Sequence, residues 1–167
     1  MSVEEKYNFN KFIQRIYVSK NIIEVYNMWT VVELIEKWYV VNASYHTFDG
    51  RLRAREENIK INDEYEWKWV DGTLLHGKIL LADGKENLGF TFGNSVIVSI
   101  KLKVISENRT LVELTQEQSL TDWESNFQNY MACFPGWSFY LINLKSVCEG
   151  GLDLRETSPN VEMLVNI

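Results

Sequence analysis

The region from Ala43 to Glu117 is a succession of short segments separated by residues that favour tight turns. Asp71-Gly72 and Asp83-Gly84 are the strongest signals, because Asp-Gly supplies the positive φ angles that two-residue hairpin turns require. The segments between the turns are rich in β-branched and aromatic residues, and no helical pattern alternates with them. The sequence therefore predicts an antiparallel meander and argues against a parallel sheet built from strand–helix–strand units.

Three further segments precede this pattern. Residues 12–18 predict a first strand, and apolar residues at helical spacing in 21–29 and 31–38 predict two short helices directly after it. The run 55–61 is also predicted as a strand. The alternating Arg51, Arg53 and Arg55 would then form a small basic strip on an edge strand, where charged residues are common. The total is seven or eight strands.

A long apolar helix is predicted over residues 134–151. Pro135 would occupy its first turn, where a missing N–H costs nothing, and Gly150-Gly151 would end it. A separate polar and aromatic helical stretch is predicted over 122–130. The apolar residues of the main helix recur at three- and four-residue steps, which places on one face Trp137, Tyr140, Leu141, Leu144, Val147 and Cys148.

Length and charge limit the protein class. The chain has 167 residues, of which 46% are hydrophobic, and this suits a single soluble domain over 1–155 with a C-terminal tail over 156–167. The net charge of −6 argues against nucleic-acid binding, which depends on Lys and Arg neutralising phosphates. We expect no membrane span, because no apolar run approaches the roughly 20 residues needed. The N-terminus lacks a secretory pattern, so we expect a cytoplasmic protein.

The cysteines and histidines predict neither a disulfide nor a metal site. Cys133 and Cys148 are 15 positions apart in or beside the predicted helix, too far for an intrachain bridge, so both are expected to be reduced packing residues. The only histidines are His46 and His76, which makes a histidine-rich metal site improbable. We expect no cofactor, since no dinucleotide, phosphate-loop or zinc motif is present.

Aromatic residues are concentrated on one face of the predicted sheet. Strict alternation puts Tyr65, Trp67 and Trp69 on one face and Glu66 and Lys68 on the other. This face must meet something apolar, and the 134–151 helix is the obvious partner. Large aromatics on a concave face either fill a core or line a ligand pocket, and the sequence leaves both open. The predicted lining is Trp38, Tyr45, Tyr65, Trp67, Trp69, His76, Phe90, Phe92, Gln116, Trp137, Tyr140 and Leu141.

Several motifs resemble the SRPBCC (START-like, birch-pollen-allergen-like) superfamily. They are NDEYEW at 62–67, GKIL at 77–80, LGFTF at 88–92, GW at 136–137 and NLK at 143–145. Within it the chain most resembles the bacterial branch named after the activator of the heat-shock-protein-90 ATPase, over about residues 10–155. The resemblance implies an α+β helix-grip fold, in which a curved antiparallel sheet of about seven strands wraps around a long C-terminal helix. It also implies a hydrophobic cavity between the two.

Three functions follow from these observations. The first is a non-enzymatic binding module for a small apolar or amphipathic ligand. The second is a cyclase- or hydrolase-like enzyme using the same cavity, for which His76 is the main acid–base candidate and no catalytic residue is assigned. The third is an interaction protein, either a chaperone partner or a homodimer, in which the apolar tail 161–167 or an open sheet edge takes part.

Overall fold

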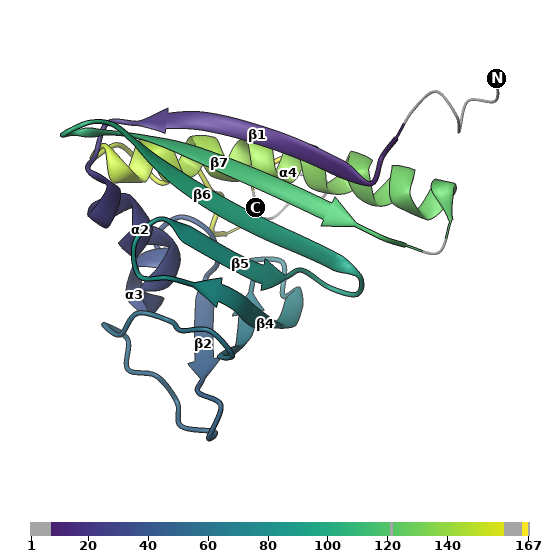
Figure 1. The fold of residues 1–167 in the computed structure, drawn as a ribbon, viewed down its shortest axis with the longest axis horizontal. Helices are drawn as coiled ribbons and strands as arrows, with labels where there is room; N and C mark the ends of the chain where they lie inside the picture. Colours follow the sequence, from purple (N-terminus) through teal and green to yellow (C-terminus); the bar gives the residue numbers. More distant parts are fainter. Residues whose placement is uncertain (1–7, 121, 159–164, 167) are drawn as a thin grey trace.

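Seven antiparallel strands form one curved sheet in the order β1-β7-β6-β5-β4-β3-β2 in the computed structural model, which describes residues 8–120, 122–158 and 165–166 (Figure 1). Strands β2 to β7 follow one another as the predicted meander, and β1 closes the order by pairing with β7. Their bounds are β1 Lys11–Val18, β2 Asn42–His46, β3 Glu64–Lys68, β4 Leu74–Ala82, β5 Asn87–Thr91, β6 Val96–Ser106 and β7 Arg109–Gln118.

The turn signals hold the meander together as expected. Gly72 and Gly84 adopt positive φ angles of 87° and 75°, which side chains other than glycine rarely tolerate. Between the turns, buried residues alternate with more exposed ones most regularly along β6 and β7. One face of the sheet is therefore apolar along its whole width, and this face meets the helices.

Two short helices follow β1, as the sequence predicts: α2 (Ile22–Thr30) and α3 (Val32–Ile35). Asn21 caps α2, since its side chain accepts a hydrogen bond from the Glu24 amide at 3.0 Å. Helix α3 is shorter than the predicted 31–38 stretch. The chain leaves it early and carries the side chains of Trp38, Tyr39 and Val40 into the core, where each is at most 1% exposed.

The C-terminal helix is longer than predicted. Helix α4 (Trp123–Cys148) runs unbroken for 26 residues, so the prediction of two helices with Pro135 in a first turn is wrong. A proline inside a helix leaves the carbonyl four residues earlier without its N–H partner. That residue is Met131, which lies on the exposed side of the helix with 54% of its surface accessible. Phe12 of β1 also contacts two rings that precede the proline, Tyr130 at 5.1 Å and Phe134 at 5.2 Å.

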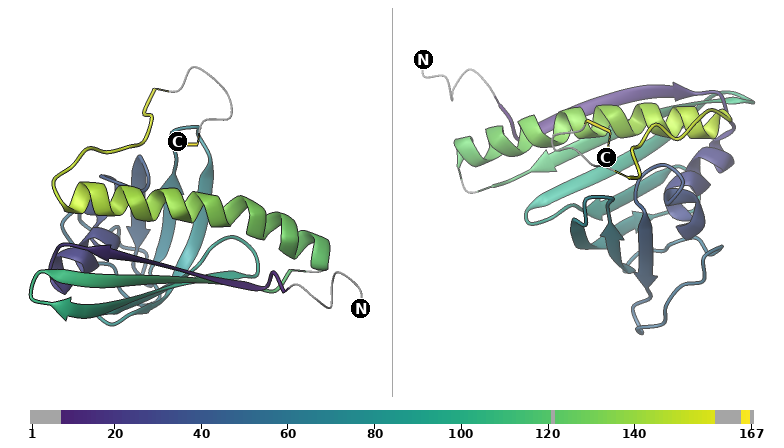
Figure 2. Two further views of the ribbon diagram at one scale, coloured as in Figure 1. Left: turned by 90° about the horizontal axis from the view of Figure 1, so that it is seen from above. Right: turned by 180° about the vertical axis from the view of Figure 1, so that it is seen from behind.

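Figure 2 shows α4 lying along the inner side of the sheet, with β1, β7 and β6 beneath it. Its C-terminal half buries Trp137, Leu141 and Leu144 against the sheet and α2. This arrangement confirms the predicted helix-grip architecture. None of the described helices is long and apolar enough to cross a membrane.

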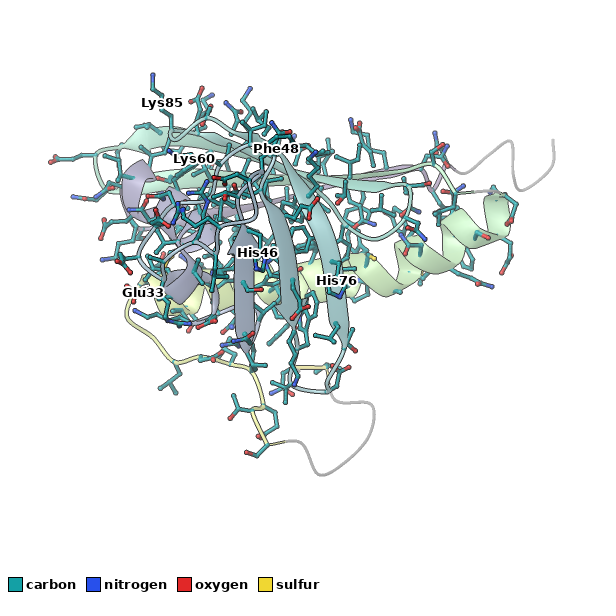
Figure 3. The ribbon with its side chains drawn as sticks, turned by 90° about the horizontal axis from the view of Figure 1, so that it is seen from below. Glu33, His46, Phe48, Lys60, His76 and Lys85 are labelled. Carbon is teal, nitrogen blue, oxygen red and sulfur yellow. The ribbon has the colours of Figure 1, made fainter. Side chains whose placement is uncertain are left out.

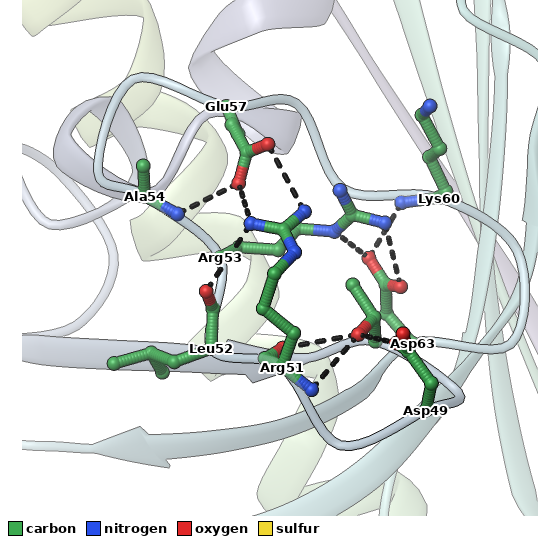
Figure 4. Close-up of polar contacts among 9 residues, drawn as sticks. Asp49, Arg51, Leu52, Arg53, Ala54, Glu57, Lys60 and Asp63 are labelled. Carbon is green, nitrogen blue, oxygen red and sulfur yellow. Dashed lines mark hydrogen bonds and ion pairs between the residues drawn. The ribbon is translucent and has the colours of Figure 1, made fainter.

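The segment 55–61 is not a strand, which corrects the prediction of a basic strip. Residues 47–63 form a long loop, in which Arg51 is ion-paired with Glu57 and Arg53 with Asp63 (Figure 4). Arg55 is ion-paired with Glu36, which directly follows α3. The Arg53–Asp63 pair is buried and bidentate, and the Lys60 amide also donates to Asp63 at 2.7 Å. The arginines at every second position therefore serve separate contacts of the loop and do not form one face of a strand.

The chain beyond α4 turns back over the helix. Asn143, fully buried, donates to the Trp38 carbonyl at 2.7 Å and accepts from the Leu154 amide at 2.8 Å. Arg155 pairs with Asp153 and donates to the Glu36 carbonyl. The predicted interaction segment 161–167 lies outside the described residues, except for Val165 and Asn166.

Candidate functional site

A pocket of about 190 Å³ opens between α4 and the sheet. The helix supplies residues 132, 133, 136, 137 and 140, whose spacing places them on one helix face. Trp69 and Phe92 come from the sheet, each one residue beyond the end of its strand, β3 or β5. The lining residues are Tyr39, Trp69, Phe92, Ala132, Cys133, Gly136, Trp137 and Tyr140.

Tyr39 organises the aromatic walls of this pocket. Its ring stacks on Trp137, with ring centres 5.3 Å apart and an interplanar angle of 12°. The rings of Tyr140 and Trp69 make T-shaped contacts with the Tyr39 ring, with ring centres 4.8 and 5.4 Å from it. Tyr39 was not among the residues predicted to line a cavity. Its place in the middle of the apolar run Trp38-Tyr39-Val40, one residue past the predicted helix, was the only signal for it.

The pocket stays open because two small residues lie on the pocket face of α4. Ala132 and Gly136 are one helical turn apart, and nothing lies within 4 Å of the position that a Gly136 Cβ would occupy. A larger side chain at either position would project into the space. Glycine inside a helix costs about 1 kcal/mol relative to alanine. Gly136 therefore lowers the stability of the helix and leaves space in the pocket.

The polar groups of the pocket are uncharged near neutral pH. Burial raises the pKa of the Tyr140 phenol to about 12, against the lowering effects of Arg155 and of a hydrogen bond with Trp69. Burial also raises the pKa of the Cys133 thiol. The described residues that line the pocket include no carboxylate and no imidazole. The arrangement is therefore suited to holding an apolar molecule, and the hydrogen-bonding side-chain groups of its lining are phenols, indoles and a thiol.

Four of the residues predicted to line a cavity do line this pocket: Trp69, Phe92, Trp137 and Tyr140. The others, apart from His76, lie deeper, where they pack on one another. Tyr65 stacks on Trp67 at 3.8 Å, and the Trp67 indole N–H donates to the Tyr45 hydroxyl at 2.8 Å. The predicted residues in this filled region are Trp38, Tyr45, Tyr65, Trp67, Phe90, Gln116 and Leu141, each at most 3% exposed.

His76 lies apart from the pocket, on the outer face of the sheet (Figure 3). Its side chain is 67% exposed, and its Nδ1 atom is 3.6 Å from the Glu66 carboxylate on the neighbouring strand. His46 lines the same outer depression from β2. In the part of the chain that the structure describes, no three His, Cys, Asp or Glu side chains are grouped to hold a metal ion.

No family model and no curated protein sequence matches this chain. Its fold, in contrast, is shared with many solved structures. Protein SSP2350 from Staphylococcus saprophyticus matches with a TM-score of 0.69 and 17% identity, over 87% of this chain and 96% of that chain. DynU16, a protein in the dynemicin biosynthetic locus, matches with a TM-score of 0.67 and 14% identity, over 89% of this chain and 50% of that chain.

The Aha1 dimer from Colwellia psychrerythraea matches with a TM-score of 0.63 and 15% identity, over 84% of this chain and 97% of that chain. At these identities the similarity is one of fold. It coincides with the seven-stranded order and the long C-terminal helix described above. The chain therefore has the helix-grip fold that the sequence resemblance predicts, and it shares this fold with the Aha1 protein.

Proposed function

We propose that the protein binds a small uncharged molecule with one aromatic ring or an apolar group of similar size, in the pocket between α4 and the sheet. The observation that carries the proposal is the aromatic lining around the open space at Gly136. Ligand sites in proteins are mostly apolar and aromatic, with a few polar groups that orient the ligand. The Tyr140 hydroxyl and the Cys133 thiol are the candidates for that role.

The size of the pocket limits the ligand. A dry cavity of about 150 Å³ holds benzene, so a pocket of about 190 Å³ suits one ring with a short substituent. A charged ligand is disfavoured, because burying an unpaired charge costs far more than burying a neutral polar group. We place this binding in the cytoplasm, in keeping with the two free cysteines.

Two measurements test the proposal. Native mass spectrometry of freshly purified protein would report a retained small molecule. Titration with benzyl alcohol and with benzoate, followed by the indole N–H signals of Trp69 and Trp137, compares a neutral and a charged ligand of one size. We expect benzyl alcohol to shift these signals and benzoate to leave them in place. Equal shifts with both compounds would contradict the proposal.

A variant tests whether the ligand binds in this pocket or elsewhere on the protein. Gly136→Leu fills the open space, so we expect it to abolish the benzyl alcohol response. Met131→Leu is the matched control, because Met131 lies on the same helix, is 54% exposed and does not line the pocket. Unchanged binding by Gly136→Leu would place the ligand elsewhere.

Self-association is a second candidate function, favoured by the similarity to a protein whose solution structure is a dimer. Light scattering coupled to size exclusion over a range of concentrations tests it. A mass of 19.6 kDa at every concentration would contradict a homodimer. Contact with a chaperone and catalysis in the cavity stay predictions from the sequence.

A further inference from the structure

A second depression, of about 360 Å³, shares no residue with the α4 pocket. Its walls come from α2, from the loop that precedes β3 and from the β4–β5 turn. We call it the α2 groove and define it by Ile23, Tyr26, Asn27, Asn58, Lys60 and Ile61. No local sequence pattern predicts this groove, because these segments are far apart in the chain.

Two exposed isoleucines line opposite walls of the α2 groove. Ile23 on α2 is 69% exposed, and Ile61 in the loop before β3 is 53% exposed. Single exposed apolar residues are common on protein surfaces. Here both border one depression, and Ala82 and the buried Ile59 add further apolar surface to it. The groove can therefore cover an alkyl group from two sides.

Three polar groups of the groove keep hydrogen-bond donors that no described residue accepts from. The Tyr26 hydroxyl accepts from the Gly84 amide at 2.9 Å, and its own proton has no acceptor among the described residues. The Asn27 side-chain oxygen accepts from Asn58 at 3.1 Å, which leaves the Asn27 amide NH₂ as the end without such a bond. Lys60 makes no ion pair with any residue in the described ranges. This donor set suits a ligand group that only accepts.

The carboxylate in the lining, that of Asp83, already accepts hydrogen bonds within its own turn. Asp83 accepts hydrogen bonds from the backbone amides of Lys85, Glu86 and Asn87 at 2.8, 2.9 and 3.0 Å, and from the Asn87 side chain at 2.6 Å. Four donors therefore occupy its oxygens and stabilise its ionised form, and within the described ranges it forms no ion pair with Lys60. The ammonium group of Lys60 remains available to an incoming anion.

We propose that the α2 groove binds a small amphipathic carboxylate. Its carboxylate would accept from Lys60 and from the Tyr26 and Asn27 donors, and its alkyl group would lie between Ile23 and Ile61. Hydrogen bonds to a charged partner are about twice as strong as neutral ones, so the carboxylate and not the alkyl group sets the preference of the site.

Titration of isoleucine-methyl-labelled protein with hexanoate and with hexanamide tests this site. The two probes share an alkyl chain and differ in charge. We expect hexanoate to shift the Ile23 and Ile61 methyl signals, and hexanamide to shift them only at much higher concentration. The proposal is overturned if hexanamide binds as well as hexanoate, or if hexanoate shifts only signals around Trp69 and Trp137.

Two matched variants test the role of Lys60. Lys60→Gln should weaken hexanoate binding about tenfold, the value of one charge-assisted hydrogen bond. Lys85→Gln removes the same charge from the adjoining turn, on the same side of the molecule in Figure 3, but Lys85 does not line the groove. We expect binding by Lys85→Gln to match the wild type. Equal weakening by both variants would show general attraction to a basic surface and overturn the proposal.

Discussion

The aromatic ring of Tyr65 lies on the backbone of Gly77, its register partner on β4. A Cβ atom at Gly77 would overlap the hydroxyl end of the ring. The Tyr65 hydroxyl also donates to the Thr91 carbonyl, one strand further on, at 2.5 Å. Tyr65 therefore crosses β4 and ties β3 to β5, and Gly77 is required because it leaves space for this side chain.

Replacing Gly77 with alanine should destabilise the protein by about 1–3 kcal/mol, the usual cost of overpacking. Urea unfolding measures the change. Gly89→Ala is the matched control in the next strand, because its Cβ would meet Leu81 at 3.4 Å, an ordinary contact distance. The cost of Gly77→Ala should shrink when Tyr65 is also replaced by leucine, and an undiminished cost would contradict the steric explanation.

The buried Arg53–Asp63 pair should be more important for stability than its exposed neighbour. Asp63→Asn leaves the Arg53 charge without its counter-ion, where the side chain is only 6% exposed, so we expect a loss of about 3–5 kcal/mol. Glu57→Gln removes the partner of Arg51, a side chain that is 53% exposed, and should cost at most about 1 kcal/mol. Equal losses in denaturant unfolding would show that burial does not set the difference.

Acid stability should depend on Asp83. Burial opposes ionisation of this carboxyl group, but the hydrogen bonds from Asn87, Lys85 and Glu86 lower its pKa to about 2. A carboxyl whose pKa falls on folding adds stability above the unfolded value of about 3.9, and this stability is lost as the pH drops through the folded value. We expect the free energy of unfolding to fall between pH 4 and pH 2, and to fall less steeply in Asp83→Asn.

Measuring both proteins over this pH range separates Asp83 from other acidic groups, because the remaining carboxyl groups are common to the two. Asparagine keeps a side-chain oxygen that can accept from the same turn amides, so the variant should stay folded at neutral pH. Identical pH profiles would contradict the role given to Asp83.

The buried hydrogen bond between Trp137 and Gln116 should couple α4 to the sheet. The Trp137 indole N–H donates to the Gln116 side-chain oxygen at 2.9 Å, and both residues are at most 2% exposed. Gln116→Leu leaves a buried donor unsatisfied, which should cost about 1–3 kcal/mol. A double-mutant cycle with Trp137→Phe isolates the pair, and a coupling energy of zero would contradict it.

Local sequence patterns predicted the sheet because its strands are adjacent in the chain and its turns have specific chemistry. In the Asp71-Gly72 and Asp83-Gly84 turns the glycines adopt positive φ angles, and alternation then decides which face of each strand is apolar. The 47–63 loop could not be predicted in this way. The alternation of Arg51, Arg53 and Arg55 resembles a strand, and the contacts that fix the loop join Arg53 to Asp63 and Arg55 to Glu36, pairs that no local pattern reveals.

The candidate site was predicted only in part for a related reason. An aromatic residue on the inner face can fill the core or line a pocket, and only packing decides between them. Trp67 and Phe90 meet edge to face at 5.1 Å and fill the space between them. Trp69 and Phe92 follow the same alternation two residues later, but they lie beyond the strand ends, opposite the small Gly136.

Pro135 gives helix α4 a weak point next to the pocket. The missing amide removes one helical hydrogen bond, while the aromatic contacts of Phe12 anchor one arm of the helix and the burial of Trp137, Leu141 and Leu144 anchors the other. The helix segments before and after Pro135 can therefore open to solvent independently. We expect the amide hydrogens of the two segments to exchange at different rates, with the change at this residue. A molecule held against Gly136 would contact both arms at once, so its binding would make their opening a single cooperative event.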